Sequence, residues 1–172
     1  MYRLLFIPVI ACLTSCELSV KMNTPGTAQS VKENMQTGLK TSANGLSFVD
    51  HYLINDKNEQ LVLTQFQAGN VIAIVLTGVK NFTIVEQRAY PGLSLTVTDT
   101  SGNTVMQTGN LFENYTDGFS EKDAQTLRAS LTIGAPLKEG DYKLEAKFWD
   151  TKGKGVIISK LDFSVVSENE YD

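Results

Sequence analysis

The chain is short of the side chains that build metal and catalytic centres. Its two cysteines, Cys12 and Cys16, both lie at the N-terminus, and His51 is its single histidine. A zinc site needs three or four His, Cys or acidic ligands at close spacing, so none is expected. The rest of the chain has no cysteine for an internal disulfide or a thiol nucleophile. No G-x-S-x-G turn is present, so a His-based triad is not expected either, and the sequence offers no catalytic residues.

Long apolar runs and clusters of basic residues are also missing. The N-terminal apolar run that starts at Leu4 stops after about ten residues, far below the roughly 20 that a membrane-spanning helix needs. The formal net charge is −4, with lysines scattered among acids and hydroxyl residues. Nucleic acid binding requires clustered Lys and Arg, so it is excluded as a function. At 172 residues, one folded domain is the default.

The N-terminus instead carries the pattern of a processing signal. Arg3 supplies a positive charge, Leu4–Ile10 an apolar stretch, and Leu13–Cys16 reads Leu-Thr-Ser-Cys. This pattern resembles the lipobox of bacterial lipoprotein signal peptides, in which a peptidase cuts before the cysteine and acyl chains such as palmitate are attached to it. Two or more acyl chains hold a protein firmly at a bilayer, so the resemblance implies membrane anchoring through Cys16. An ordinary secretory signal, cut without lipidation, is the alternative.

Composition divides the chain into four segments. We expect a signal peptide at 1–15, a lipidated cysteine with a flexible tether at 16–33, a β-sandwich domain at 34–167 and a polar tail at 168–172. The tether is inferred because the segment is rich in Ser, Thr, Asn, Gln and Lys and contains Pro25 and Gly26. An edge strand at Leu18–Met22 is the alternative.

The apolar residues beyond this segment alternate with period two, which predicts β-strands. Tyr142–Phe148 alternates four apolar with three charged residues, and the turn Asp150–Gly155 joins it to a second alternating run, which predicts a hairpin. Leu93–Thr98 and Thr104–Gln107 predict another. Val71–Leu76 is continuously apolar, as in a central strand covered on both faces. Further strands are predicted at Met35–Thr41, Leu46–Ile54, Leu61–Phe66, Phe82–Val85 and Ala129–Ile133.

A short helix is expected over Glu121–Leu127, with Ser120 as its N-cap. Many short strands separated by turn residues predict an all-β fold, an antiparallel two-sheet sandwich with one short crossover helix. Leu137–Tyr142, followed by the alternating strand, resembles the tyrosine corner of immunoglobulin-like and fibronectin-like sandwiches. The resemblance implies that the Tyr142 hydroxyl bonds back to the backbone a few residues upstream.

Together with the lipobox, the chain resembles small anchored sandwich lipoproteins of Bacteroides-type Gram-negative bacteria. The resemblance implies a location in the cell envelope, at the outer membrane, facing the periplasm or the cell surface.

Candidate contact residues are concentrated in the loop Gly109–Phe119. It interleaves Phe112, Tyr115 and Phe119 with amides and with Asp117. Aromatic rings beside hydrogen-bonding groups suit sugar faces or peptides, and long loops are often functional. The alternative is that these rings fold inward and cap the core.

Trp149 and His51 are two further positions of interest. Trp149 points away from Leu144 and Phe148, so it either offers a flat contact surface or packs under the Asp150–Gly155 turn. His51 is expected at a surface or half-buried site. The acidic turns at 55–59 and 114–117 are explained by ordinary turn chemistry, so neither a metal nor a cofactor is expected.

The combined prediction is a non-catalytic binding or accessory module of the cell envelope. Its partner would be a glycan, a peptide or an envelope protein, in addition to the membrane itself. Two alternatives remain: a structural subunit that assembles by β-strand pairing, and a hydrolase that uses two carboxylates.

Overall fold

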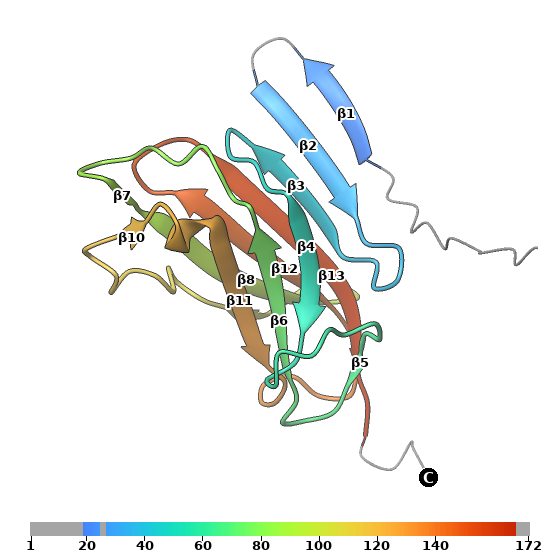
Figure 1. Ribbon diagram of the computed structural model, residues 1–172. Helices are drawn as coiled ribbons and strands as arrows, with labels where there is room; N and C mark the ends of the chain where they lie inside the picture. Colours follow the sequence, from blue (N-terminus) through green and yellow to red (C-terminus); the bar gives the residue numbers. More distant parts are fainter. Residues whose placement is uncertain (1–18, 25–26, 168–172) are drawn as a thin grey trace, which may run out of the picture.

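The computed structural model describes residues 19–24 and 27–167, so Cys16, the signal segment and the tail at 168–172 lie outside it. Figure 1 shows an all-β chain arranged in layers. The strands are β1 Ser19–Thr24, β2 Thr27–Glu33, β3 Lys40–Asn44, β4 Asp50–Ile54, β5 Gln65–Phe66, β6 Val71–Thr77, β7 Arg88–Ala89, β8 Pro91–Asp99, β9 Thr104–Gln107, β10 Phe119–Ser120, β11 Thr126–Thr132, β12 Gly140–Asp150 and β13 Val156–Val165.

Two sheets form the sandwich, as the sequence predicts. The large sheet has the order β1-β2-β3-β13-β12-β8-β9, and the small sheet has the order β11-β6-β4. All of these pairs are antiparallel, while the short β5 pairs in parallel with the end of β13, beyond the part that pairs with β3. β7 and β10 form a separate two-stranded ribbon at one end of the molecule.

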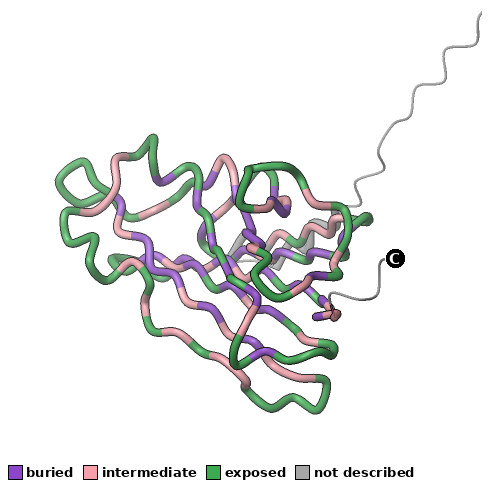
Figure 2. The backbone as a smooth tube through the Cα atoms, turned by 90° about the horizontal axis from the view of Figure 1, so that it is seen from below, coloured by how far each residue is buried: buried purple, intermediate pink, exposed green. Residues whose placement is uncertain are grey.

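The core lies between the two sheets. Along β12, Leu144, Ala146 and Phe148 are buried, and they face residues of β6 such as Ile74 and Leu76. In Figure 2 the buried positions run along the strands, and exposed positions gather in the connecting loops. The hairpin of β12 and β13 is confirmed, with Trp149 opposite Val156 next to its turn.

Strand β6 is buried on both faces, as its continuous apolar run predicts. Ile72, Ile74 and Leu76 belong to the main core, whereas Ala73 and Val75 pack with Ile54 and Tyr52 on the other side of the small sheet. A central strand without a wet face has no reason to alternate. The pattern therefore identified both the strand and its place in the sheet.

Four predicted strands are wrong in part or in full. The predicted Leu46–Ile54 is a strand only from Asp50, where β4 starts, because Ser47 forms no more than an isolated bridge with Lys80. The predicted Leu61–Phe66 is a strand only over Gln65–Phe66, which is β5.

The other two are at Met35–Thr41 and Phe82–Val85. Met35–Thr41 is a turn up to Lys40, where β3 starts, because the Asn34 side chain accepts hydrogen bonds from the backbone N–H groups of Gln36 and Thr37. Phe82–Val85 forms no strand. There, Val85 and Arg88 bond across a tight turn whose central residues, Glu86 and Gln87, have φ of 51° and 62°.

The expected crossover helix is also wrong. Only the 3₁₀ turn Asp123–Gln125 forms, with the Ser120 hydroxyl accepting from the Asp123 N–H at 3.1 Å. Leu127, Ala129 and Leu131 are buried at alternate positions of β11. This alternation places all three in the core as a strand, so burial overrides local helix preference. Over residues 19–24 and 27–167, no helix is long and apolar enough to cross a bilayer.

The segment expected to be a tether contains β1 and β2. β1 pairs with β2, and β2 pairs with β3, so this hairpin extends the large sheet at its edge. The alternative of an edge strand agrees with β1 over Ser19–Met22, while Leu18 lies outside the described residues. A polar composition did not reveal this pairing, because its partner is the open backbone edge of β3 rather than an apolar surface.

His51 is fully buried, with 3% of its surface exposed, which corrects the expected surface or half-buried position. Its Nδ1 lies 2.7 Å from the Thr41 hydroxyl, and that hydroxyl lies 2.8 Å from the Ser159 hydroxyl. His51 belongs to β4 in the small sheet, and its two partners belong to the large sheet. The histidine therefore joins the two layers through a buried polar chain, and it is not part of an exposed site.

Candidate functional site on the outer face of the large sheet

The outer face of the large sheet is formed by every second residue of its strands. On β12 these residues are Lys143, Glu145, Lys147 and Trp149, because the residues between them are buried. The registers place neighbours beside each of them and so define four rows across the sheet. From one end to the other, the rows are Thr98–Lys143–Asp162, Thr96–Glu145–Lys160–Lys40, Ser94–Lys147–Ile158–Ser42 and Gly92–Trp149–Val156–Asn44.

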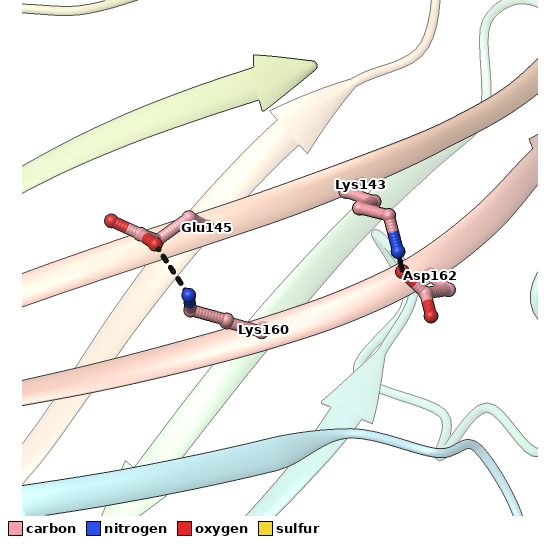
Figure 3. Close-up of polar contacts among 4 residues, drawn as sticks. All are labelled: Lys143, Glu145, Lys160 and Asp162. Atoms are coloured by element: carbon pink, nitrogen blue, oxygen red, sulfur yellow. Dashed lines mark hydrogen bonds and ion pairs between the residues drawn. The ribbon is translucent and has the colours of Figure 1, made fainter. Parts of the chain in front are cut away.

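Charged side chains on the first two rows are paired. Figure 3 shows Lys143 bonded to Asp162 at 3.1 Å and Lys160 bonded to Glu145 at 3.2 Å, each pair bridging β12 and β13. A third pair, Lys40 with Glu33 at 3.4 Å, extends the second row to β2. These side chains are largely exposed, and exposed pairs contribute only about 0–1 kcal/mol each to stability. Their main consequence is a surface with donors and acceptors in close alternation and with balanced charge.

These rows line a trough of about 550 Å³. Thr96 and Thr98 of β8 form one side, and Thr37 and Gly38 of the β2–β3 turn form the other. The volume is within the range of about 300–1,000 Å³ that is usual for ligand clefts. We refer to this hollow as the outer-face trough.

Trp149 occupies the row at the opposite end of the same face. A Cβ on Gly92 would lie 2.1 Å from the indole Cε2, so the ring rests directly on the glycine of the neighbouring strand. The Lys147 ammonium lies 5.9 Å from the ring centroid. A recess of about 480 Å³ adjoins the ring and includes Gly153–Gly155 of the following turn. Trp149 is thus half-buried and seated on β8, and residues of the following turn line the same recess.

The recess and the outer-face trough are adjacent. The recess includes Ser94, Lys147 and Ile158, which form the row next to Thr96, Glu145 and Lys160 of the trough. Alternate residues on a strand are about 7 Å apart, so the four rows together extend about 20 Å along β12. The face therefore changes from hydroxyl and charged groups at one end to an aromatic ring at the other.

The aromatic residues of the 109–119 loop form a second, separate cluster. Phe112 lies 5.7 Å from Tyr115 and 5.4 Å from Phe119, and Tyr115 lies 5.1 Å from Phe119, measured between ring centroids. Phe112 packs against the core, while 58% of the Tyr115 surface is exposed. The rings therefore both cap the core and reach solvent. Asp117 is exposed in the same loop.

The structure does not unite all the sequence-derived candidates. Among the described residues, the ring contacts of the loop cluster involve Phe112, Tyr115 and Phe119 and do not include Trp149. Tyr142 lies near the other end of β12, where its hydroxyl donates to the Lys138 carbonyl at 2.9 Å and accepts from the Lys138 N–H at 3.1 Å. This is the backward bond that the tyrosine-corner resemblance implies. It stabilises the chain where β12 begins.

The sequence alone does not single out the trough residues Thr96, Thr98, Lys160 and Asp162. The period-two pattern places each of them on a wet face, but it does not say which strands are neighbours. Only the registers of β8, β12 and β13 bring them together. Within residues 19–24 and 27–167, no three His, Cys, Asp or Glu side chains converge in a way that could hold a metal ion.

Comparisons with known proteins identify no family for the chain. No protein-family model matches the chain, and no curated protein matches it. Among solved structures, the chain is similar to the C-terminal domain of Wzt, with 10% identity, a TM-score of 0.47 and coverage of 83% of this chain and 80% of that one.

Two further similarities are weaker. A Niemann-Pick type C2 protein from Japanese carpenter ant has 8% identity, a TM-score of 0.41 and coverage of 69% of this chain and 91% of that one. A chitin binding domain from Burkholderia pseudomallei has 9% identity, a TM-score of 0.38 and coverage of 60% and 57%. Scores this low carry no argument about function. The class that the chain's own strands define is an all-β, sandwich-like domain of mainly antiparallel sheets.

Proposed function

We propose that the protein is a lipid-anchored, extracytoplasmic binding module of the cell envelope, without catalytic activity, whose ligand surface is the outer face of the large sheet. The observation that carries this proposal is the outer-face trough, a hollow of ligand size lined by residues of five neighbouring strands, β2, β3, β13, β12 and β8. A site on strands is held more rigidly than one on loops. The lipobox resemblance supports anchoring at Cys16, and the anchored sandwich lipoproteins support placement at the outer membrane.

The charges in the trough favour binding over hydrolysis. A carboxylate-dependent hydrolase needs two acids that face each other across a cleft. Here Glu145 is bonded to Lys160 and Asp162 to Lys143. Each acid is therefore held as an acceptor in an ion pair, which suits recognition of a ligand's hydroxyl or amide groups.

Assembly by strand pairing at β11 is less well supported. β11 is an edge of the small sheet, but its outward residues Thr126, Arg128, Ser130 and Thr132 are polar and exposed. Arg128 also bonds to Asn58 at 2.9 Å, across the sheet. Charged residues on an edge strand discourage pairing with another chain.

The Tyr142 bond to Lys138 supports an immunoglobulin-like relationship for the sandwich, which we include in the proposal.

Anchoring is tested with Cys16→Ser in the full-length chain. We expect the wild type to sediment with membranes and the variant to be released into the soluble extracytoplasmic fraction. Mass spectrometry of the wild type should show acyl chains on the cysteine. A variant that still sediments, or a wild-type protein with an intact initiator methionine and an unmodified thiol, would show that the anchor is wrong.

Binding is tested separately, with the released Cys16→Ser protein. Thr96→Tyr fills the trough, and Thr132→Tyr places the same bulk on the exposed face of β11 as a matched control. We expect the first substitution to abolish retention of envelope components and the second to leave it unchanged. Equal retention by both variants would contradict the outer face as the ligand surface.

A further inference from the structure

The outer face also indicates a ligand class. We propose that it binds an uncharged linear saccharide, lying along β12 with one sugar ring on Trp149 and its hydroxyl groups in the outer-face trough. This inference rests on the proposed binding function and adds the chemistry of the ligand. Three features of the face support it: the balanced charge of the trough rows, the paired backbone of the strands and the position of Trp149 on Gly92.

Charge balance argues against a charged polymer. Three lysines and three acids lie on the trough rows, and they pair as Lys143–Asp162, Lys160–Glu145 and Lys40–Glu33. Within these rows a polyanion or a polycation would meet a repelling group beside each attracting one, and Lys147 of the next row adds a single positive charge. A polyhydroxylated ligand gains from the same arrangement, because each of its hydroxyls can accept from a lysine and donate to a carboxylate. Thr96 and Thr98 add two more groups that both donate and accept.

The backbone of the face argues against an extended peptide. β12 pairs with β8 on one side and with β13 on the other along nearly its whole length. On the far side of β8, the N–H groups of Leu93 and Leu95 donate to the side chains of Asn110 and Thr108. Peptides that bind by strand addition need free backbone groups at a sheet edge. This face offers side chains alone, which is how a ligand without a peptide backbone is recognised.

Trp149 supplies a flat apolar surface at the end of the polar rows. Gly92 supports the indole from below, since even a methyl group there would overlap the ring. A ring held in place before binding loses little conformational freedom when a ligand stacks on it. A sugar ring has an apolar C–H face and polar edges, and it therefore matches an aromatic ring beside hydroxyl and charged groups. The Lys147 ammonium lies over the ring, 5.9 Å from its centroid, where it can donate to such an edge.

The test uses the fact that Trp149 is the single tryptophan of the chain. Its fluorescence reports this face directly. The full-length Cys16→Ser protein is titrated with neutral oligosaccharides of glucose, N-acetylglucosamine, mannose and galactose, and with oligogalacturonate as a charged counterpart. We expect at least one neutral series to change the emission saturably, with an affinity that changes less than about twofold between about 50 and 500 mM salt.

Variants then locate the contact by calorimetry. Trp149→Ala should weaken binding of the neutral sugar by about tenfold or more, equivalent to about 1.4 kcal/mol. Thr96→Val with Thr98→Val, which leaves the indole in place, should weaken it about threefold or more. Tyr115→Ala, in the separate loop cluster, should have no effect. Circular dichroism melting checks that each variant is folded. If Trp149→Ala is not folded, the Thr96→Val, Thr98→Val double variant tests whether the sugar binds on this face.

The failures of the two proposals are distinguishable. If no neutral sugar binds, or if only oligogalacturonate binds with a strong salt dependence, the saccharide inference is overturned. The binding function stands in that case as long as Thr96→Tyr still abolishes retention of envelope components and Thr132→Tyr does not. If neutral sugars bind but Trp149 and the threonines have no influence, the placement on this face is overturned.

Discussion

The Thr41 hydroxyl on β3 lies 2.7 Å from Nδ1 of His51 on β4, and this contact connects the large sheet to the small one. Both residues are buried, and Ser159 of β13 continues the chain of hydrogen bonds. Among the described residues, no buried side-chain nitrogen or oxygen lacks a partner. Polar groups inside this sandwich are thus tolerated because each one is satisfied.

Thr41→Val should therefore destabilise the fold. The substitution keeps the volume but removes the hydroxyl that His51 and Ser159 share, so we expect a loss of about 1–3 kcal/mol in the free energy of unfolding. Urea denaturation followed by circular dichroism measures it. Thr98→Val, on the wet face, is the matched control and should change stability by less than about 0.5 kcal/mol. Equal values for the two variants would refute the role of the buried chain.

Gly92→Ala should displace the indole of Trp149. The added Cβ would lie 2.1 Å from the ring, so the ring must leave its seat on β8. We expect a red shift of the tryptophan emission and a destabilisation of about 1–3 kcal/mol. Gly134→Ala is a suitable control, because a Cβ at Gly134 meets nothing within 4 Å. An unchanged emission spectrum in Gly92→Ala would show that the ring does not lie on the glycine.

Tyr142→Phe should reduce the free energy of unfolding by less than Thr41→Val does. The substitution removes the hydroxyl that exchanges two hydrogen bonds with the backbone of Lys138 but keeps the ring stacked on Phe163. We expect the lost hydrogen bonds to reduce the free energy of unfolding by about 0.5–1.5 kcal/mol. Tyr115→Phe, which changes an exposed tyrosine in the same way, should be close to neutral. A neutral Tyr142→Phe would mean that the corner does not stabilise the start of β12.

The β8–β9 turn should make a pH-dependent contribution to the stability of the fold. Hydrogen bonds from the side chain and the backbone of Asn103 lower the pKa of Asp99 below its ordinary value of 3.8. A carboxyl with a lowered folded-state pKa stabilises the fold above its unfolded pKa, and the stabilisation is lost as the pH falls through the folded one. NMR titration should therefore place the Asp99 pKa below 3.8 in the wild type and nearer that value in Asn103→Ala.

The same pair of proteins gives a stability measurement. Asn103→Ala should be less stable than the wild type at neutral pH, and the part of the difference due to the Asp99 charge should disappear below the folded-state pKa. A difference that is independent of pH would assign the effect of Asn103 to turn geometry alone.

The local sequence pattern was sufficient to predict a strand where the burial of its faces alone determined which residues are apolar. The alternation in Tyr142–Phe148 and the unbroken apolar run in Val71–Leu76 each specify a strand and the environment of its faces, because side chains on a strand point to opposite sides. The resemblance to a tyrosine corner implied the Tyr142 bond to Lys138, which joins groups four residues apart. These features depend on neighbours in the chain.

Features that depend on distant partners emerged only in three dimensions. β2 is a strand because it pairs with the backbone edge of β3. Leu127 belongs to a strand and not to the expected helix, because in the strand its side chain is buried in the core between the sheets. The outer-face trough exists because the registers align Thr96, Glu145 and Lys160 in one row. Alternation in the sequence predicts that a residue faces outward. The hydrogen-bond register between strands determines which other outward-facing residues become its neighbours.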